Sequence, residues 1–231
     1  MSKERITALR QLATERYILS TLPTLYLPLW KRDGSTFLRD DGSGTVCTVT
    51  GALWTPQGRS FDIAHDDVIN IPDSSLWNIS SNDFTISLWV KHSELGVVHH
   101  YVSQGIDNNY YWFFRKESDN TISCTYKNGD NTAANRINIA GIATLNANTF
   151  YYVTISKIGT TWQLYINGVA DGVTTQSVSA GDFAHTLEIG AMTWTGNASM
   201  YGVIGEVLLY SRGLTSVGNL QNYLATKWRY R

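Results

Sequence analysis

The stretch from Asn82 to Lys91 constrains the fold of this chain more than any other part of the sequence. Apolar and mostly polar side chains alternate along it, with Phe84, Ile86, Leu88 and Val90 in one set and Thr85, Ser87, Trp89 and Lys91 in the other. Because successive side chains of a β-strand point to opposite faces, this pattern predicts a strand with one face in an apolar core. We therefore expect residues 84–91 to be a central strand of a sheet that packs against a second sheet.

Short stretches of the same kind recur at regular spacing along most of the chain. They are residues 25–30, 46–49, 59–62, 68–72, 99–104, 110–115, 121–127, 136–139, 150–157, 161–166, 169–170, 187–190 and 201–210. Asn128-Gly129 and Asn167-Gly168 are dipeptides typical of tight hairpin turns. Many short strands with such turns predict an all-β sandwich of two antiparallel sheets. Pro28 lacks a backbone N–H, so the first strand is expected at a sheet edge or a bulge.

Both ends of the chain have helical patterns. Ile6, Leu9, Ala13 and Tyr17 fall at helical spacing near the N-terminus, and Leu220, Tyr223, Leu224 and Trp228 form one stripe near the C-terminus. We predict a helical arm over residues 1–23 and one sandwich domain over residues 24–231, which includes the C-terminal helix. Two roles of the arm stay open with about equal weight. It either packs on its own sandwich or docks on a neighbouring subunit through the first of these stripes.

Charge and cysteine content narrow the classes of function. The 18 basic and 19 acidic residues are spread evenly, without the basic patch that nucleic-acid binding requires. No apolar run approaches the ~20 residues of a membrane span, and residues 1–5 lead into no apolar signal segment, so neither a membrane span nor export is expected. Synthesis in the cytoplasm favours buried free thiols at Cys47 and Cys124 over a disulfide.

Three blocks of sequence carry a family resemblance. They are GALWT at 51–55 with GRSFD at 58–62 and DDVINIP at 66–72, then DFTISLWVK at 83–91, then GVIGEVLLYSRGL at 202–214. In this order, and with the hairpin sequence WQLYING at 162–168, they resemble the laminin-G-like domains of the concanavalin A-like lectin/glucanase superfamily. The resemblance covers roughly residues 24–227 and implies a jelly-roll sandwich of two antiparallel sheets. Gly205 and Gly218 depart from it, since relatives usually have Asp at the first position and a helix-capping Glu at the second.

The resemblance also implies a calcium site. Asp40 and Asp41 lie in a loop similar to the Asp-x-Ser-Gly loop of relatives, and Glu206 lies in the block that often supplies a further acid. The alternative is that Asp41 caps a turn and Glu206 pairs with a surface base. Because Gly205 stands where relatives have a candidate ligand, the sequence slightly favours this alternative. The pattern requires no cofactor, and a structural calcium ion is the one metal that it would accommodate.

Aromatic residues suggest a surface that binds glycans, because sugar rings stack on flat aromatic faces. Tyr110, Trp112 and Phe114 share one face of a predicted strand, whereas Tyr111 and Phe113 share the other, so one set is less core-like. The candidate glycan contacts are Trp112, Tyr126, Asn128 and Trp194, of which Trp194 lies in a polar loop. The alternative for each single residue is a place in the core of a thick sandwich.

Catalysis is not expected. Glucanases of this superfamily carry two carboxylates in a Glu-x-Asp-x-Glu strand motif, whereas Glu188 and Glu206 are lone acids here. His99 and His100 are adjacent on a predicted strand, so their rings point to opposite faces and cannot bind one metal together.

These observations lead to one leading hypothesis and two alternatives. The leading hypothesis is a non-catalytic virion protein, a capsid decoration or a head- or tail-associated module, because sandwiches without a leader resemble structural proteins of tailed phages. Such a protein would be made in the host cytoplasm, contact other virion subunits through its arm, form homo-oligomers and bind a host-surface glycan. The first alternative is a stand-alone lectin-like module that binds carbohydrate or protein outside a cell or at its surface. A glycoside hydrolase is the third hypothesis.

Overall fold

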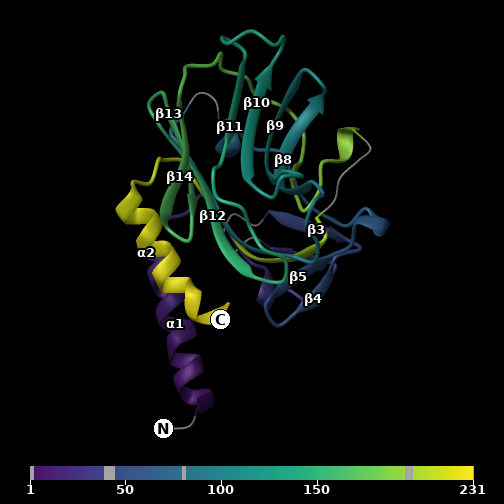
Figure 1. Cartoon of the computed structure of the whole chain (residues 1–231). Coiled ribbons are helices and arrows are strands. Elements are labelled where there is room, and N and C mark those ends of the chain that lie inside the picture. Colours follow the sequence, from purple (N-terminus) through teal and green to yellow (C-terminus); the bar gives the residue numbers. More distant parts are fainter. Residues whose placement is uncertain (1–2, 39–44, 80–81, 196–199, 231) are drawn as a thin grey trace.

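A computed structural model describes residues 3–38, 45–79, 82–195 and 200–230 of the chain. These residues form two antiparallel sheets of eight strands each, packed face to face, with a helix near each end of the chain (Figure 1). The prediction of an all-β jelly-roll sandwich with terminal helices is therefore confirmed. Among the described residues, neither helix combines the length and the hydrophobicity that crossing a bilayer requires.

The first sheet, here called the covered sheet, has β7 near its middle. Its strands in spatial order are β14 (Val169–Thr175), β13 (Thr161–Ile166), β12 (Phe150–Ile158), β7 (Phe84–His92), β16 (Gly202–Tyr210), β5 (Gly58–Phe61) and β4 (Leu53–Thr55), and β1 (Leu25–Pro28) also pairs with β16. β7 pairs with β12 along one side and with β16 along the other. Its set of Phe84, Ile86, Leu88 and Val90 lies in the core between the sheets, as the alternation predicts.

The second sheet, here called the open sheet, faces the first across this core. Its strands in spatial order are β11 (Arg136–Ala140), β10 (Ile122–Asn128), β9 (Tyr110–Lys116), β8 (His99–Asp107), β15 (Leu187–Ile189), β6 (Val68–Ile71), β3 (Val46–Thr50) and β2 (Thr36–Leu38). The sequence pattern missed β2, a three-residue strand that pairs with β3 alone. Cys47 and Cys124 are both buried in this core and neither forms a disulfide, as predicted.

β16 has two different neighbours along one edge. Its first part, Gly202–Ile204, pairs with β5, and its second part, Glu206–Leu209, pairs with β1. The register against β7 shifts between Ile204 and Val207. A side chain at Gly205, inside this irregularity, would collide with the ring of Tyr230. The close approach of the C-terminal segment therefore explains why glycine stands where relatives have Asp, and β1, with Pro28, pairs with no other described strand, as expected of an edge strand.

Two helices lie against the outer face of the covered sheet. They are α1 (Lys3–Ser20) and α2 (Ser216–Thr226), and the short 3-10 turns of the chain are η1 (Leu29–Lys31), η2 (Ile63–His65), η3 (Ser75–Trp77), η4 (Thr193–Thr195) and η5 (Lys227–Arg229). Thr215 begins α2 without a side-chain capping bond, which agrees with the loss of the capping partner at Gly218.

α2 packs a largely polar face against the covered sheet. Its buried residues are Asn219, Asn222 and Thr226, whereas Leu220 and Leu224 are 41% and 46% exposed. Of the predicted stripe, Tyr223 packs against Trp89 and its neighbours, and the two leucines are mostly exposed. The reason lies in the sheet below, whose outer face carries hydroxyl groups, so a polar helix face supplies hydrogen-bond partners that leucine cannot.

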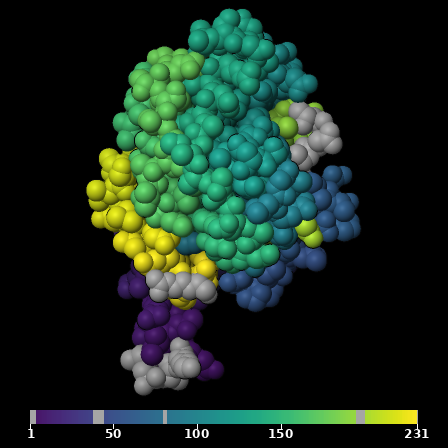
Figure 2. Space-filling model, in the orientation of Figure 1, coloured from purple at the N-terminus to yellow at the C-terminus, as the bar shows by residue number. Residues whose placement is uncertain are grey.

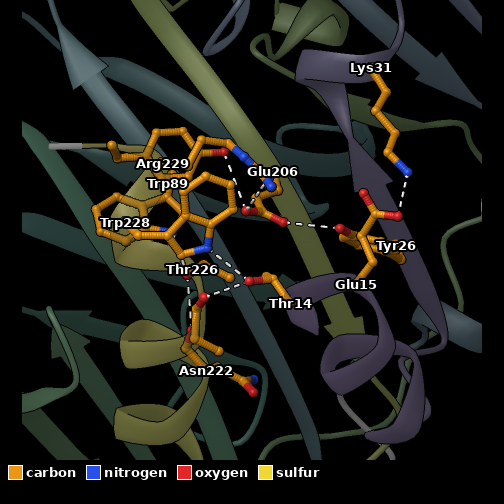
Figure 3. Close-up of polar contacts among 12 residues, drawn as sticks. Thr14, Glu15, Tyr26, Lys31, Trp89, Glu206, Asn222, Thr226, Trp228 and Arg229 are labelled. Atoms are coloured by element: carbon orange, nitrogen blue, oxygen red, sulfur yellow. Dashed lines mark hydrogen bonds and ion pairs between the residues drawn. The ribbon is translucent and has the colours of Figure 1, made fainter. Parts of the chain in front are cut away.

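The polar contacts between the helices and the covered sheet form a continuous cluster, here called the helix seam (Figure 3). The indole N–H of Trp89 donates to Thr226 Oγ1 at 2.7 Å, and Asn222 Nδ2 donates to Tyr210 Oη at 3.1 Å. Thr14 Oγ1 donates to the carbonyl of Ala225 and accepts from Trp228 Nε1, at 3.0 and 2.8 Å. Trp89 also stacks on Tyr230, with ring centroids 4.5 Å apart. The second face of β7 thus lies beneath a further layer.

Glu206 is the one charged side chain of the covered sheet at the centre of this seam. Its carboxylate accepts hydrogen bonds from Tyr26 at 3.2 Å and Tyr230 at 3.4 Å, and Arg229 Nη1 lies 3.2 Å from Oε1. The Arg229 guanidinium lies 3.6 Å from the Trp30 ring centroid. Burial raises the pKa of Glu206, and Arg229 opposes that shift.

α1 joins the seam only through its C-terminal half. Thr14 and Ile18 are buried, and Tyr17 packs against Ile18 and its neighbours. The N-terminal half projects from the body of the protein (Figures 1 and 2), and Leu9 is 51% exposed there. Of the predicted docking stripe, Ile6, Leu9 and Ala13 are exposed and Tyr17 is partly buried. Its docking on a partner stays a prediction.

Candidate functional site

A hollow of about 550 Å³ opens on the outer face of the open sheet. We call it the aromatic groove. It is lined by Asn108, Tyr111, Phe113, Arg115, Glu117, Thr125, Arg136, Asn138, Met192 and Trp194. β9, β10 and β11 lie side by side beneath it (Figure 1), and the segment with Met192 and Trp194 borders it.

The floor of the groove follows from the alternation of β9. Trp112 and Phe114 are buried between the sheets, so Tyr111, Phe113 and Arg115 point outward. The Tyr111 and Phe113 rings are parallel to within 4°, with centroids 5.5 Å apart, and the Arg115 guanidinium lies 4.1 Å from the Phe113 centroid. Phe113 is only 6% exposed, so the strand presents the Tyr111 ring and the Arg115 guanidinium to the groove, with Phe113 packed beneath them.

Trp194 borders the groove beside Tyr111, with ring centroids 6.5 Å apart. Its position is fixed by Glu188, a buried residue whose carboxylate accepts hydrogen bonds from the backbone N–H of Thr193, at 2.8 Å, and from the Thr193 hydroxyl. Gly105 on β8 makes room for the indole, because a side chain there would collide with Trp194 and Tyr111. Glu188, a lone acid in the sequence, is thus a positioning residue for this segment.

Polar groups on β10 and β11 complete the groove. Thr125 Oγ1 donates to Asn138 Oδ1 at 2.7 Å. Arg115 Nε lies 2.7 Å from Glu117 Oε1, and the Ser123 hydroxyl donates to the same oxygen. Since the amide group of Asn138 is exposed, it can exchange hydrogen bonds with a ligand.

His100 lies beneath the groove, and its ring packs edge-on against Phe113 at 5.2 Å. Burial lowers the pKa of His100 to about 3, so the ring is neutral at physiological pH. His99 packs instead near His92, at 5.3 Å. The prediction that the two adjacent imidazoles point to opposite faces is confirmed.

The structure does not bring the four predicted glycan contacts together. Trp112 and Tyr126 are 1% and 0% exposed, so direct contact with a glycan is wrong for both. Trp112 Nε1 donates to Gln104 Oε1, and Tyr126 donates to the carbonyl of Ser179. Asn128 donates to the carbonyl of Ala180 at 2.9 Å and does not line the groove. Trp194 alone of the four lines it.

Of the three predicted calcium ligands, the structure describes one, Glu206. Asp40 and Asp41 lie outside the described residues, so the loop that they form stays a prediction. Glu206 lies in the helix seam, where both carboxylate oxygens accept hydrogen bonds from protein groups. In the described part of the chain, no three His, Cys, Asp or Glu side chains gather as a metal site would require.

Several groove residues were not identified from the sequence, chiefly Arg115, Arg136 and Asn138. One signal could have found the first, because Arg115 follows Tyr111 and Phe113 at alternate positions of an aromatic strand. Arg136 and Asn138 come from β11, and their place beside Tyr111 depends on the order of strands in the sheet. The local sequence pattern does not predict the order of strands in a sheet.

The groove offers groups that can bind a ligand. It offers aromatic faces for stacking and amide, hydroxyl and guanidinium groups for orientation. Glycoside hydrolysis uses two carboxyl groups, ~5–5.5 Å apart in retaining enzymes. Among the residues that line the groove, Glu117 is the single acid, and it is paired with Arg115.

Comparison with known proteins identifies the family. The model of a family described as the concanavalin A-like lectin/glucanases superfamily matches residues 64–217. The chain belongs to this superfamily. The sequence of this superfamily member matches none of the curated proteins with which it was compared.

Solved structures with the same fold include toxin binding domains and a sialidase. The binding domain of Paraclostridial Mosquitocidal Protein 1 matches with a TM-score of 0.69 and 18% identity, over 91% of this chain and 53% of that one. The binding domain of botulinum neurotoxin DC in complex with SialylT matches with 0.65 and 16%, over 88% and 51%. Trypanosoma rangeli sialidase in complex with sialic acid matches with 0.68 and 16%, over 89% and 33%. This superfamily member thus spans about half the length of the two toxin binding domains, and the likeness establishes a lectin-like sandwich fold.

Proposed function

We propose that this chain is a non-catalytic, lectin-like binding protein whose aromatic groove takes a glycan. The observation that carries the proposal is the Tyr111 ring at the groove with Trp194 held beside it. Aromatic faces of this kind bind the apolar faces of sugar rings, and adjacent amides and hydroxyls fix their orientation. Two structures of similar fold are complexes with SialylT and with sialic acid, which supports a carbohydrate as the ligand.

A glycan array with purified protein tests this proposal. We expect the wild-type chain to bind a subset of glycans, and Tyr111→Ala and Trp194→Ala to lose that binding at least about tenfold, the loss of about 1.4 kcal/mol. Tyr110→Ala is the matched control, because Tyr110 is an exposed tyrosine on the same strand outside the groove. Loss of binding in the control alone, or no binding by any form, would refute the proposal. Release of reducing sugar from a bound glycan would refute its non-catalytic part.

We further propose that the chain is a subunit of a virus particle, as a capsid decoration or a head- or tail-associated protein. The projecting half of α1 supports this proposal, because Ile6, Leu9 and Leu12 are not covered there by any described part of the chain. Burying such a face on another virion subunit, or against further copies of this chain, would remove it from water. A stand-alone module at a cell surface is the alternative, and it would be absent from particles.

Purified particles with and without changes in α1 test this second proposal. Leu9→Gln with Leu12→Gln should leave the fold intact, since both side chains are about half exposed, and should remove the protein from particles. Leu53→Gln is the matched control, because Leu53 is 71% exposed on β4 away from the helices. Deletion of residues 1–20 is a poorer test, since it also removes Thr14 and Ile18 from the helix seam. Normal incorporation of the double variant would refute attachment through α1.

A further inference from the structure

The lining of the aromatic groove has a small surplus of positive charge. Its charged side chains are Arg115 and Arg136 against Glu117, two cations and one anion, and Lys127 and Asp130 lie close to it without lining it. The chain as a whole has a net charge of −1 at pH 7. The surplus is therefore local to this face, and it points to a ligand with negative charge.

Most of these charges have partners within the protein. Arg115 pairs with Glu117, and the Lys127 ammonium donates to the carbonyl of Asn108 at 2.9 Å and to Asn109 Oδ1 at 3.1 Å. The Asp130 carboxylate accepts bonds from Thr132 and Asn135. These groups are satisfied without a ligand.

Arg136 differs from them. Its Nη1 donates to Asn131 Oδ1 at 3.3 Å, a neutral acceptor, and its buried Nε has no hydrogen-bond partner. Within the described ranges it forms no ion pair. A guanidinium is a planar fork of donors that matches a carboxylate in two parallel bonds, and burying one of its N–H groups without an acceptor is unfavourable. Arg136 is thus a groove cation that has no carboxylate partner among the described residues.

Arg136 and Tyr111 lie close enough together for one short ligand to contact both side chains. Lys127 on β10 pairs in register with Tyr111 on one side and with Arg136 on the other. All three side chains belong to the outer face, so Tyr111 and Arg136 are two strand spacings apart, about 10 Å. Asn138 lies two residues from Arg136 on the same face of β11 and also lines the groove.

We propose that the groove selects an acidic glycan, with the planar carboxylate of a sugar acid bound by Arg136 while a sugar ring stacks on Tyr111. This inference rests on the proposed glycan-binding function and names its ligand class. Arg136 is then the residue that determines specificity, and Tyr111 and Trp194 supply affinity shared by charged and neutral sugars. The exposed amide of Asn138 would bind a hydroxyl group of the same ligand.

A glycan array that prints each carboxylated glycan beside its methyl ester and beside sulfated members tests the inference. The ester has nearly the same shape but no charge. We expect the wild-type chain to bind the acids at least about tenfold more tightly than their esters. Arg136→Gln should reduce that ratio to about twofold or less while it keeps binding to the esters, and Arg136→Lys should give an intermediate ratio, because a point charge replaces the fork. Arg10→Gln is the control for net charge, since Arg10 is exposed on α1.

The outcomes separate this inference from the function on which it rests. Equal binding of acids and esters by the wild-type chain, or an unchanged ratio in Arg136→Gln, would overturn acid selection and leave glycan binding intact. Stronger binding of sulfated glycans than of carboxylated ones would overturn the assignment to a carboxylate. Binding of no glycan at all, with the folded state verified by circular dichroism, would instead refute the proposed function.

Discussion

The outer faces of the two sheets carry similar kinds of side chain, but the helices cover only one of them. On the covered sheet, Trp89 and Tyr210 find hydrogen-bond partners on α2, and Glu206 finds Arg229. On the open sheet, Tyr111 and Arg136 line the aromatic groove, and Arg136 bonds to the neutral amide of Asn131 instead of a carboxylate. An unpaired N–H does not separate the two faces, because Arg229 Nη2 in the helix seam also lacks a hydrogen-bond partner. The difference shows that polar and aromatic residues on an outer face do not by themselves identify a binding site. A better sign is an accessible cation that has no carboxylate partner among the described residues.

The largest effect on this comparison should come from breaking the ion pair of the covered face. Glu206→Ala leaves the Arg229 guanidinium buried without its carboxylate and removes the acceptor of Tyr26 and Tyr230. We expect a loss of about 3–5 kcal/mol in the free energy of unfolding, measured by urea denaturation. Glu206→Gln keeps an acceptor oxygen and should lose less. If Glu206→Ala is as stable as the wild-type chain, the seam is not what holds the helices.

The next effect is the pH dependence of the unfolding free energy, which follows from the pKa of two buried histidines in the folded and the unfolded chain. Burial lowers the pKa of both His92 and His100 to about 3, whereas an unfolded histidine titrates near 6.5. Below pH 6.5 the unfolded chain therefore binds protons that the folded chain does not, and stability falls as pH falls. Between pH 7 and pH 5 each histidine should cost about 2 kcal/mol of unfolding free energy.

Urea denaturation at several pH values checks this slope. The double variant His92→Gln with His100→Gln should be less stable at pH 7 and should show a clearly flatter pH dependence. Glu206 acts in the opposite direction, because burial raises its pKa and so favours the folded state as pH falls toward the ordinary value of the carboxyl group. An unchanged slope in the double variant would contradict the assignment to histidine.

A smaller effect compares one threonine on each face. Thr226→Val removes the acceptor of the buried Trp89 indole, and we expect a loss of about 1–3 kcal/mol in unfolding free energy. Thr125→Val on the open sheet removes a hydrogen bond to Asn138, whose exposed amide can bond to water instead, and should cost about 1 kcal/mol or less. Equal losses in thermal denaturation of the two variants would remove the distinction between a covered and an open face.

The smallest effect concerns the exposed leucines of α2. Leu220→Gln and Leu224→Gln should each change the unfolding free energy by no more than about 0.5 kcal/mol, because both side chains are exposed. The control is Asn222→Leu, in the same helix, which should destabilise the protein by removing the bond to Tyr210. A large loss in either leucine variant would contradict the packing of α2 through its polar face.

Local patterns predicted the fold well and the site poorly. The alternation over residues 84–91 placed Phe84 and Ile86 in the core, and the same period along β9 separated Tyr111 and Phe113 from Trp112 and Phe114. Trp194 was found because it lies in a polar loop segment. The prediction of Trp112 and Tyr126 as glycan contacts was wrong, because the residue type alone does not distinguish an aromatic side chain in the core from one on the surface.

The sequence by itself determined the elements of this protein and the side of each strand that faces the core, because period-two alternation and hairpin dipeptides act between near neighbours. Only the tertiary structure decided which outer face stays open. Helix positions depend on partners far along the chain, such as Thr14 with Ala225 and Glu206 with Arg229, and so do the strand pairings that bring Tyr111 beside Arg136. The free energy of these contacts depends on proximity in space, which residue spacing along the chain does not record.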